Sequence, residues 1–287
     1  MKSNNIGVLI FTKDEEIHLQ RCINSIKSIS STIYIVDSYS KDKTLIIAKK
    51  NNAKIFKKTF FYLADSKIWA TKKIKFKEKY ILLIDADEYL DKSSLIFIKN
   101  KIDYIKKFNG IYVERNLIFK KRQIRFGGTY PQKQLRLWKN GKAKCNDSIM
   151  DERMIVKNKC TYIKEIRIFD NNLKKENFFL KKHIQYAKRE ALDQIFFQNI
   201  KKLTIRVRLK SFFYQYFQLY FIRAIILFFF KNILLLGILD GLKGIEYSFK
   251  RDLIYRLMVD FFICKFKLIN LKKLTKKKTN RKNYLRL

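Results

Sequence analysis

The chain has 287 residues and is 47% hydrophobic, which excludes a disordered chain and allows one large domain or a domain with a substantial appendage. Its formal net charge of +39 concerns partners rather than fold, so nucleic acid, acidic lipid or phosphorylated substrates are expected. The abundant Lys, Ile and Asn are also typical of an AT-rich genome, which raises basicity without any selection for binding.

The cysteines and the amino terminus indicate a cytosolic protein. The four cysteines are scattered without metal-binding spacing, so reduced thiols are expected. The first apolar run is only six residues long before charge returns, which is too short for a signal peptide or an anchor.

The first part of the chain alternates between short apolar runs and helical spacing. This alternation predicts βαβ units and a mostly parallel sheet. Strands are predicted at Gly7–Thr12, Thr32–Val36, Ala53–Phe56 and Ile81–Ile84, with helices following Lys13 and spanning Leu45–Lys50 and Leu63–Lys75.

The fourth of these strands is followed directly by acidic residues, in the stretch YILLIDADEYLD. Asp85 and Asp87 are two residues apart, so in an extended segment they face the same side. Such a pair suits a hard divalent cation that also binds phosphate oxygens, which indicates a nucleotide diphosphate. The alternative interpretation is a solvated turn in which Asp91 caps the next helix.

Two other strands also end in acidic turns, at Asp14–Glu16 and at Asp37 and Asp42. Strand ends of a parallel sheet share one edge, so these turns are expected to line a common cleft. Asp37 could accept hydrogen bonds from a uracil imide or a ribose hydroxyl. Because neither GxxxxGK nor GxGxxG occurs, a metal ion would have to neutralise the diphosphate.

The rhythm changes after Glu88. A helix is predicted at Ser93–Phe108, ending at Asn109–Gly110 as a cap, followed by strands at Ile111–Phe119 and Gln134–Trp138. Between these strands, a shaped loop around Tyr130 contains the only proline of the chain. Arg136 alternates with leucines, so it lies on the outward face of its strand or meets an acceptor phosphate.

From Asn177 onward the pattern is helical, and Ser211–Leu239 is the most apolar region. Arg223 and Lys231 interrupt it, and no uncharged run reaches about 18 residues. It is therefore predicted to lie on or dip into a membrane surface, with aromatic residues toward the lipid and Lys or Arg at the headgroups. The alternatives are a buried helical hairpin, an oligomer interface or a single spanning helix. Residues 265–287 add ten Lys or Arg and no acidic residue.

Several motifs together resemble a known family. T-x-D-E-E at Thr12–Glu16, V-D-S-x-S-x-D-x-T at Val36–Thr44 and L-x-D-A-D-E at Leu83–Glu88 are similar to family 2 glycosyltransferases of the GT-A fold. Three further motifs resemble, more narrowly, the branch of this family that contains bacterial lipopolysaccharide core β-glucosyltransferases. The matches extend to about residue 260. These are F-G-G-x-Y-P-x-x-Q-L-R-L-W at Phe126–Trp138, D-E-R at Asp151–Arg153 and L-D-G-x-x-G at Leu239–Gly244.

The resemblance implies a role for each matching position. Thr12, Glu16, Asp37 and Asp85 would hold the nucleotide sugar, Lys67 its diphosphate, and Asp87 the Mg²⁺ or Mn²⁺ ion. Glu152 would be the general base, with Asp151 as the neighbouring alternative. Apart from the resemblance, Arg136 and Tyr130 are predicted to lie on the acceptor side. The sequence departs from the family pattern at Asp14, Ile68 and Asp151. The processive signature Q-x-x-R-W is absent, which favours addition of a single sugar.

The resulting hypothesis is a GT-A-like, Rossmann-like α/β domain at 1–170 and a basic, helical, membrane-associating region at 171–287. It would transfer a hexose, glucose foremost, from a UDP-sugar to a lipid-linked or lipopolysaccharide-core saccharide, peripherally on the cytoplasmic face of the membrane. The alternatives are a basic nucleic-acid-binding protein and a noncatalytic scaffold. The acidic turns would repel nucleic acid from the cleft, so no nucleic acid is expected.

Overall fold

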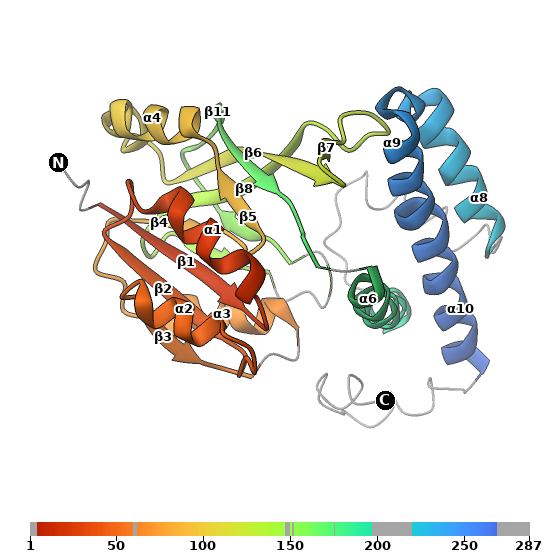
Figure 1. Cartoon of the computed structure of the whole chain (residues 1–287), viewed down its shortest axis with the longest axis horizontal. Helices are drawn as coiled ribbons and strands as arrows, with labels where there is room; N and C mark the ends of the chain where they lie inside the picture. Colours follow the sequence, from red (N-terminus) through yellow and green to blue (C-terminus); the bar gives the residue numbers. More distant parts are fainter. Residues whose placement is uncertain are drawn as a thin grey trace. The chain divides into compact units, whose positions relative to one another are not determined.

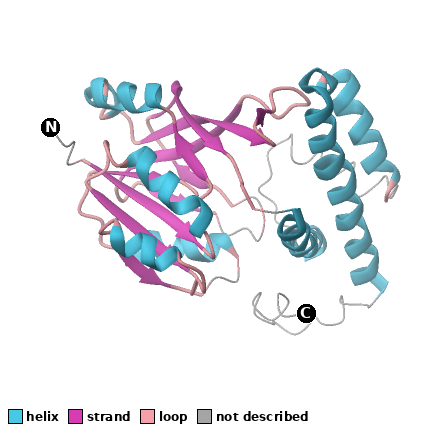
Figure 2. Cartoon of the chain, viewed as in Figure 1, coloured by secondary structure: helices cyan, strands magenta, loops and turns pink. Residues whose placement is uncertain are grey.

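The computed structural model describes residues 5–59, 62–146, 150, 152–174, 176–196 and 220–268. The chain divides into two compact units, Met1–Asp147 with Asp151–Lys174, and Ser148–Met150 with Lys175–Leu287. In the described residues, the first unit is a sheet covered by helices and the second is helical (Figure 1 and Figure 2). The predicted α/β fold class with helices at the carboxyl end is confirmed.

The first half of the sheet is parallel, as the sequence predicts. Its order is β3-β2-β1-β4, and every pairing in it is parallel. All seven residues of β1 are buried, which explains why the strand reads as a continuous apolar run. The strands are β1 (Ile6–Thr12), β2 (Thr32–Asp37), β3 (Lys54–Lys57) and β4 (Tyr80–Leu83).

Beyond β4 the sheet is mixed and continues in the order β8-β6-β11-β5. The strand β8 runs antiparallel to both β4 and β6, whereas β6 and β11 are parallel. The strand β5 pairs antiparallel with β11. These strands are β5 (Glu88–Leu90), β6 (Gly110–Phe119), β8 (Gln132–Lys139) and β11 (Cys160–Asp170). The short strand β7 (Arg122–Gln123) pairs antiparallel with the end of β6, and β9 (Ala143–Cys145) pairs with β10 (Met154–Val156) apart from the main sheet.

Helices cover both faces of this sheet. One core cluster joins the strands to apolar residues of α1, α2, α4 and α5, and the other joins them to α3 and the β9–β10 hairpin. These helices are α1 (Glu16–Ile26), α2 (Thr44–Lys50), α3 (Leu63–Lys73), α4 (Lys92–Asn100) and α5 (Ile102–Ile105).

The predicted helix at Ser93–Phe108 is divided at Lys101 into α4 and α5. Asp91 is the N-cap of α4, because its Oδ1 accepts a hydrogen bond of 2.9 Å from the Ser94 amide. The predicted cap at Asn109–Gly110 is wrong, since Gly110 is already the first residue of β6. An added Cβ at Gly110 would lie 3.0 Å from the Cys160 Sγ, so close strand packing explains this glycine.

The second unit is built from helices of several kinds. Its core forms where α6 packs against α10, through residues such as Ala187, Val259 and Ile263. The segments α9, η3 and α10 follow one another without a break, with α8 alongside (Figure 1). The bounds are α6 (Glu176–Phe196), α8 (Ile222–Phe229), η1 (Phe230–Leu234), η2 (Gly237–Asp240), α9 (Gly241–Ser248), η3 (Phe249–Ile254) and α10 (Tyr255–Leu268); η1 and η3 are π-helices and η2 is a 3₁₀-helix.

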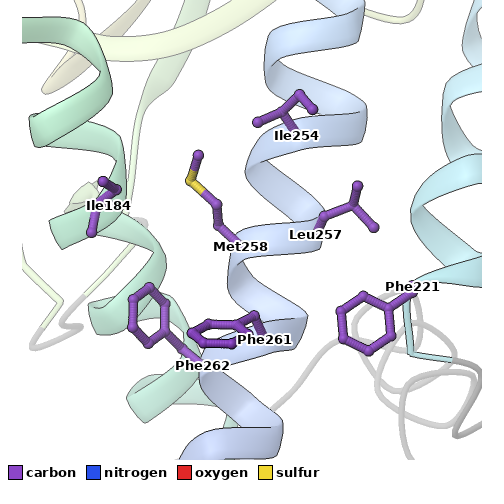
Figure 3. A pocket seen from close by; sticks show the side chains of 7 residues that line it. All are labelled: Ile184, Phe221, Ile254, Leu257, Met258, Phe261 and Phe262. Atoms are coloured by element: carbon purple, nitrogen blue, oxygen red, sulfur yellow. The ribbon is translucent and has the colours of Figure 1, made fainter. Parts of the chain in front are cut away.

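An apolar groove opens in this unit, beside α10 (Figure 3). Only apolar side chains line it, namely Ile184, Phe221, Ile254, Leu257, Met258, Phe261 and Phe262.

In the part of the chain that the structure describes, no single helix has the length and apolarity to cross a bilayer. The segments Ile222–Leu234 and Gly237–Lys267 meet those criteria only as a pair, and they are bent by 74°.

Candidate active site

The ends of β1 and β2 bring Thr12 and Asp37 together, as expected from parallel neighbours. The two residues are register partners, and the Thr12 hydroxyl donates a hydrogen bond of 2.8 Å to the Asp37 Oδ1. The Ser40 hydroxyl donates to the same oxygen, and the Ser40 amide donates to Oδ2 at 2.8 Å. Three donors thus fix a buried carboxylate at the carboxyl edge of the sheet.

The acidic loops after β1 and β2 are fastened to each other. The Glu16 Oε2 accepts a hydrogen bond of 2.9 Å from the Lys43 amide, while the Glu16 amide donates to the Asp42 Oδ2 at 3.0 Å. Burial alone would raise the pKa of Asp42, but hydrogen bonds from Thr44 outweigh it and hold that pKa below its usual value. The structure therefore shows Glu16 shaping the loop that follows β2.

The turn Asp85-Ala86-Asp87 after β4, called the DXD turn below, is tied to β8 by a buried arginine, Arg136. The Arg136 guanidinium donates to the Asp85 Oδ2 at 3.1 Å and to the Glu88 Oε1 at 2.6 Å, and its residue is only 5% exposed. Burial would raise the pKa of Asp85, but Arg136 and Lys67 outweigh it, so this pKa lies well below its ordinary value. Arg136, on β8, thus favours the ionised form of Asp85.

Glu88 lies at the centre of a larger buried network. Its Oε2 accepts a hydrogen bond of 2.9 Å from the Asp85 amide, and its Oε1 accepts one of 3.0 Å from the Arg115 Nε. Arg115 also pairs with Asp170, the last residue of β11. Burial raises the pKa of Glu88 to about 7, and Asp85 adds to this shift, while the arginines act against it.

The predicted base Glu152 forms an ion pair with Lys67. The Lys67 Nζ donates to the Glu152 Oε1 at 3.0 Å, and Lys67 is 6% exposed at its place on α3. The same ammonium group contributes to the low pKa of Asp85. Lys67 is therefore a positive centre shared between Glu152 and the DXD turn. Asp151, the alternative base, lies outside the described residues.

Asp87 contacts a segment whose role the sequence did not indicate. The Asn172 Nδ2 donates a hydrogen bond of 3.1 Å to the Asp87 Oδ2, and the Asn171 amide donates to the Asp87 carbonyl at 3.1 Å. Arg21 of α1 fastens both sides, because it donates to the carbonyls of Asp87 and Asn171. The chain leaving β11 thus lies against the DXD turn.

The same segment is bound to α1 by a buried histidine. The Leu173 amide donates to the His18 Nε2 at 2.8 Å, and the His18 Nδ1 lies 2.6 Å from the Glu15 Oε2. The Lys174 Nζ donates to the other oxygen of Glu15 at 2.6 Å. No motif spacing relates these residues, so only the tertiary structure reveals their relation.

The two residues predicted on the acceptor side are placed differently. Arg136 is buried in the ion network, with Gln134 as a further acceptor at 3.0 Å. Tyr130 lies in the loop before β8, and its side chain is exposed. Its pKa is raised by burial and by hydrogen bonding to Glu114, whose Oε2 also accepts a bond of 3.0 Å from Tyr162. The structure brings Thr12 to Asp37 and Lys67 to Glu152, but Tyr130 belongs to another group of contacts.

The donor set at the DXD turn fits a hard cation that arrives with a diphosphate. Asp85 and Asp87 are half-buried and present carboxylate oxygens, which suit Mg²⁺ or Mn²⁺. Among the described residues, no group of three or more His, Cys, Asp or Glu side chains could hold a metal. Phosphate and water would therefore have to supply most of the ligands, which is how Mg²⁺ usually binds beside phosphates.

Comparison with known proteins identifies the domain. Residues 7–149 match the family model described as glycosyl transferase family 2. An uncharacterized glycosyltransferase of Rickettsia bellii is 38% identical over 103 residues, which are 36% of this chain and 33% of that protein. Its counterpart in Rickettsia conorii is 35% identical, also over 103 residues, covering 36% of this chain and 34% of that protein.

Similarity to solved structures is more distant. The structure of S. aureus TarS residues 1–349 aligns with 90% of this chain and 90% of its own, with a TM-score of 0.43 and 14% identity.

The match to the family model shows that residues 7–149, about half of this chain, are a family 2 glycosyltransferase domain. The chain spans about a third of the length of the curated relatives it matches.

Proposed function

We propose that this chain is an inverting glycosyltransferase that transfers one hexose, with glucose as the first candidate, from a UDP-sugar. The acceptor is a saccharide of lipopolysaccharide core, capsule or another surface glycan. One observation carries the proposal: in a family 2 domain, Lys67 forms an ion pair with Glu152 and also lowers the pKa of Asp85, two residues before Asp87. The residues at this one strand end can thus bind an anionic leaving group, hold a metal ion and supply a base.

The donor side has a division of labour that the contacts support. The buried Asp37 carboxylate, oriented by Thr12 and Ser40, accepts hydrogen bonds from the uracil imide or the ribose. Asp85 faces the ribose, and Lys67 binds the diphosphate. Asp87 holds Mg²⁺ or Mn²⁺, which when bound would neutralise charge developing on the departing diphosphate.

The base is held until the donor arrives. In the structure Lys67 neutralises Glu152 at 3.0 Å, and a diphosphate competes for the same ammonium. Glu152 then accepts the proton of an acceptor hydroxyl, whose oxygen bonds to the anomeric carbon while the bond from that carbon to the phosphate oxygen breaks. UDP leaves, and the configuration inverts.

The acceptor is proposed to be lipid-linked, so that the enzyme works peripherally at the cytoplasmic face of an anionic membrane. The ten Lys or Arg of residues 265–287 support this, because clusters of basic residues bind acidic lipid headgroups. Nucleic acid is not proposed as a partner, because Asp37, Asp42 and Asp85 would repel phosphates at the cleft.

The test is slow hydrolysis of a panel of nucleotide sugars in Mn²⁺. We expect UDP release from one donor, reduced at least about 100-fold in Asp87→Ala. Asp103→Ala is the matched control, because that carboxylate is exposed on α5 and pairs only locally with Lys106. Lys67→Met should weaken UDP binding, whereas Glu152→Gln should keep UDP binding and lower transfer to an acceptor about 10²- to 10⁴-fold.

Two results would contradict the proposal. Equal hydrolysis by Asp87→Ala and the parent would remove the metal role. Failure of the folded parent to bind UDP at millimolar concentration would exclude a UDP-sugar donor, and the scaffold hypothesis would then be preferred.

A further inference from the structure

The helical hairpin at residues 222–254 has the reverse polarity of a soluble helix pair. Its buried positions are polar or small, among them Ala224, Asn232, Asp240, Ser248 and Asp252. Soluble helices bury apolar stripes and expose polar ones. Helices in lipid instead pack through small residues and polar side chains and direct large apolar residues outward.

A hydrogen-bonded polar network joins the two arms of the hairpin. The Lys231 Nζ on η1 lies 2.6 Å from the Asp252 Oδ1 on η3. The Asn232 Nδ2 donates to the Ser248 Oγ at 2.8 Å, and that hydroxyl donates to the Asp252 Oδ2 at 3.2 Å. These contacts pair the polar groups inside the hairpin with one another, apart from the buried Asn232 Oδ1, which has no hydrogen-bond partner among the described residues. A medium without water favours such internal pairing.

The two charges that interrupt the apolar sequence are both neutralised internally. Lys231 pairs with Asp252, and the Arg223 Nε donates to the buried Asp260 at 2.9 Å. The sequence predicted Lys or Arg at the lipid headgroups, whereas Lys231 and Arg223 pair with the buried carboxylates of Asp252 and Asp260. An ion pair directed inward removes the main obstacle to placing this segment in hydrocarbon.

Glycines allow the hairpin to close tightly at its turn. An added Cβ at Gly244 would lie 2.2 Å from the Asp240 Cβ, and one at Gly237 would lie 2.9 Å from the Lys231 carbonyl oxygen. Close backbone approach through glycine is typical of helix contacts in membranes, where small residues replace the hydrophobic driving force.

The outer surface of the hairpin carries many exposed apolar side chains, with the exposed Lys243 beside Leu242. Along α8 and η1 these include Ile222, Ile226, Phe229 and Ile233. Leu242 is the most exposed of them, at 86%. An exposed patch of this kind marks a site of interaction with a protein or a membrane. The turn itself contributes Leu234, Leu235, Leu236, Ile238, Leu239 and Leu242.

We propose that this hairpin inserts, turn first, into the hydrocarbon of one membrane leaflet. The inward polar network favours lipid over a second protein chain as the partner of the outer surface. An interface with another protein would not require polar side chains inside and apolar side chains outside along the whole hairpin. The thirteen residues of Ile222–Leu234 extend about 20 Å, whereas the hydrocarbon core is about 30 Å thick.

The insertion deepens the membrane part of the proposed function and is independent of the transfer reaction. A basic tail alone binds only anionic lipid and is released by salt. A hairpin in hydrocarbon also holds uncharged vesicles at high salt. Binding of the full chain to phosphatidylcholine vesicles in 1 M NaCl therefore separates the two modes without any measurement of turnover.

The experiment uses the full chain with Leu242→Trp and with Ile46→Trp as its matched control. Ile46 is an exposed isoleucine on α2, far from the hairpin in sequence. We expect acyl-chain brominated phosphatidylcholine to quench the added fluorescence at position 242 and not at position 46. Leu242→Asp combined with Leu234→Asp should lower partition into vesicles at least tenfold. Ile46→Asp combined with Ile96→Asp should leave partition unchanged, because Ile96 is an exposed isoleucine on α4.

Several outcomes would overturn the proposal. They are equal quenching at positions 46 and 242, release from uncharged vesicles at high salt, and partition unaffected by the two aspartates in a protein with native circular dichroism. A concentration-dependent dimer that protects the tryptophan at position 242 would assign the face to a second copy of the chain instead.

Discussion

At the scale of single residues, charge balance explains the behaviour of the DXD turn. Asp85, Glu88 and Asp170 contribute three carboxylates to a buried network that contains two guanidinium groups, those of Arg115 and Arg136. The excess carboxylate is accommodated by a proton. Glu88 takes it, because that side chain is fully buried while Asp85 is partly accessible.

The pH dependence of stability follows from this proton. The pKa of Glu88 is raised from 4.5 to about 7, so the unfolded chain loses the proton first as pH rises. The stabilisation is full below pH 4.5 and is lost as pH rises through 7. Relative to Glu88→Gln, the parent should therefore lose up to about 3 kcal/mol of unfolding free energy across that range.

Urea unfolding at several pH values between 4.5 and 7.5 measures this difference. Asp85 does not contribute to the slope, because its low pKa keeps it ionised throughout the range. Asp103→Asn, on the exposed surface of α5, should show the parent's slope. Parallel curves for the parent and Glu88→Gln would show that Glu88 does not titrate there.

At the scale of elements, Gly7 shows how one strand of the sheet depends on a missing side chain. An added Cβ would lie 2.8 Å from the Glu78 Oε2 and 3.2 Å from the Tyr34 Cε2. Glu78 is buried and accepts a hydrogen bond of 2.8 Å from the Tyr34 hydroxyl. The glycine therefore leaves room for this pair against β1.

Gly7→Ala should lower the free energy of unfolding by about 1–3 kcal/mol, because it overpacks a site formed by the buried Glu78 carboxylate and the Tyr34 ring. Tyr34→Phe should also destabilise by about 1–3 kcal/mol, since it leaves Glu78 without that donor. The double variant should cost less than the sum, because both changes act on Glu78. Additive effects in urea unfolding would show that the added methyl group is accommodated elsewhere.

The elements that the sequence predicted are those with simple periodicity. The strands β1, β2 and β4 are apolar runs with acidic ends, and their spacing is sufficient to place Thr12 beside Asp37. The strand β11 was missed because its register shifts between Ile163 and Arg167. This bulge places the buried Ile163 and Ile166 three residues apart, which breaks the alternation of a strand.

Site residues divide in the same way. Strand-end position indicated Asp37 and Asp85, and motif resemblance indicated Lys67 and Glu152, which the structure brings within 3.0 Å of each other. Arg115 and Asn172 could not be predicted, because neither belongs to a motif. Arg115 lies 27 residues from its partner Glu88, and Asn172 lies 85 residues from its partner Asp87. Their roles depend on pairings in the sheet that local sequence does not encode.

At the scale of the whole molecule, positive charge is concentrated at the carboxyl end. Residues 269–287 contain eight Lys or Arg and no acidic residue, so their removal reduces the formal charge from +39 to +31. Each basic residue near an anionic membrane contributes about 1 kcal/mol at most. This part of the sequence is therefore expected to supply the salt-sensitive component of membrane binding.

Replacing those eight residues by Gln should weaken binding to vesicles containing phosphatidylserine more than tenfold at 0.1 M salt and flatten its salt dependence. Binding to uncharged vesicles should be unchanged. The control replaces eight exposed lysines of the first unit. An equal loss in both proteins would show that net charge matters and position does not.

The segment following β11 also has a consequence for the order in which the protein can be completed during synthesis. Arg21 and Glu15 contact Asn171 and Lys174 across 150 and 159 residues, and β5 has β11 as its partner in the sheet. Until β11 emerges from the ribosome, β6 has an unpaired edge and Asp87 lacks its Asn172 contact. A nascent chain that ends near residue 149, where the family match ends, thus has the acidic turns after β1, β2 and β4 but lacks Glu152 and the contacts made by Asn171 and Asn172. The contacts of Glu15 and Arg21, which are synthesised early, can therefore form only after some of the last residues of the first unit have been synthesised.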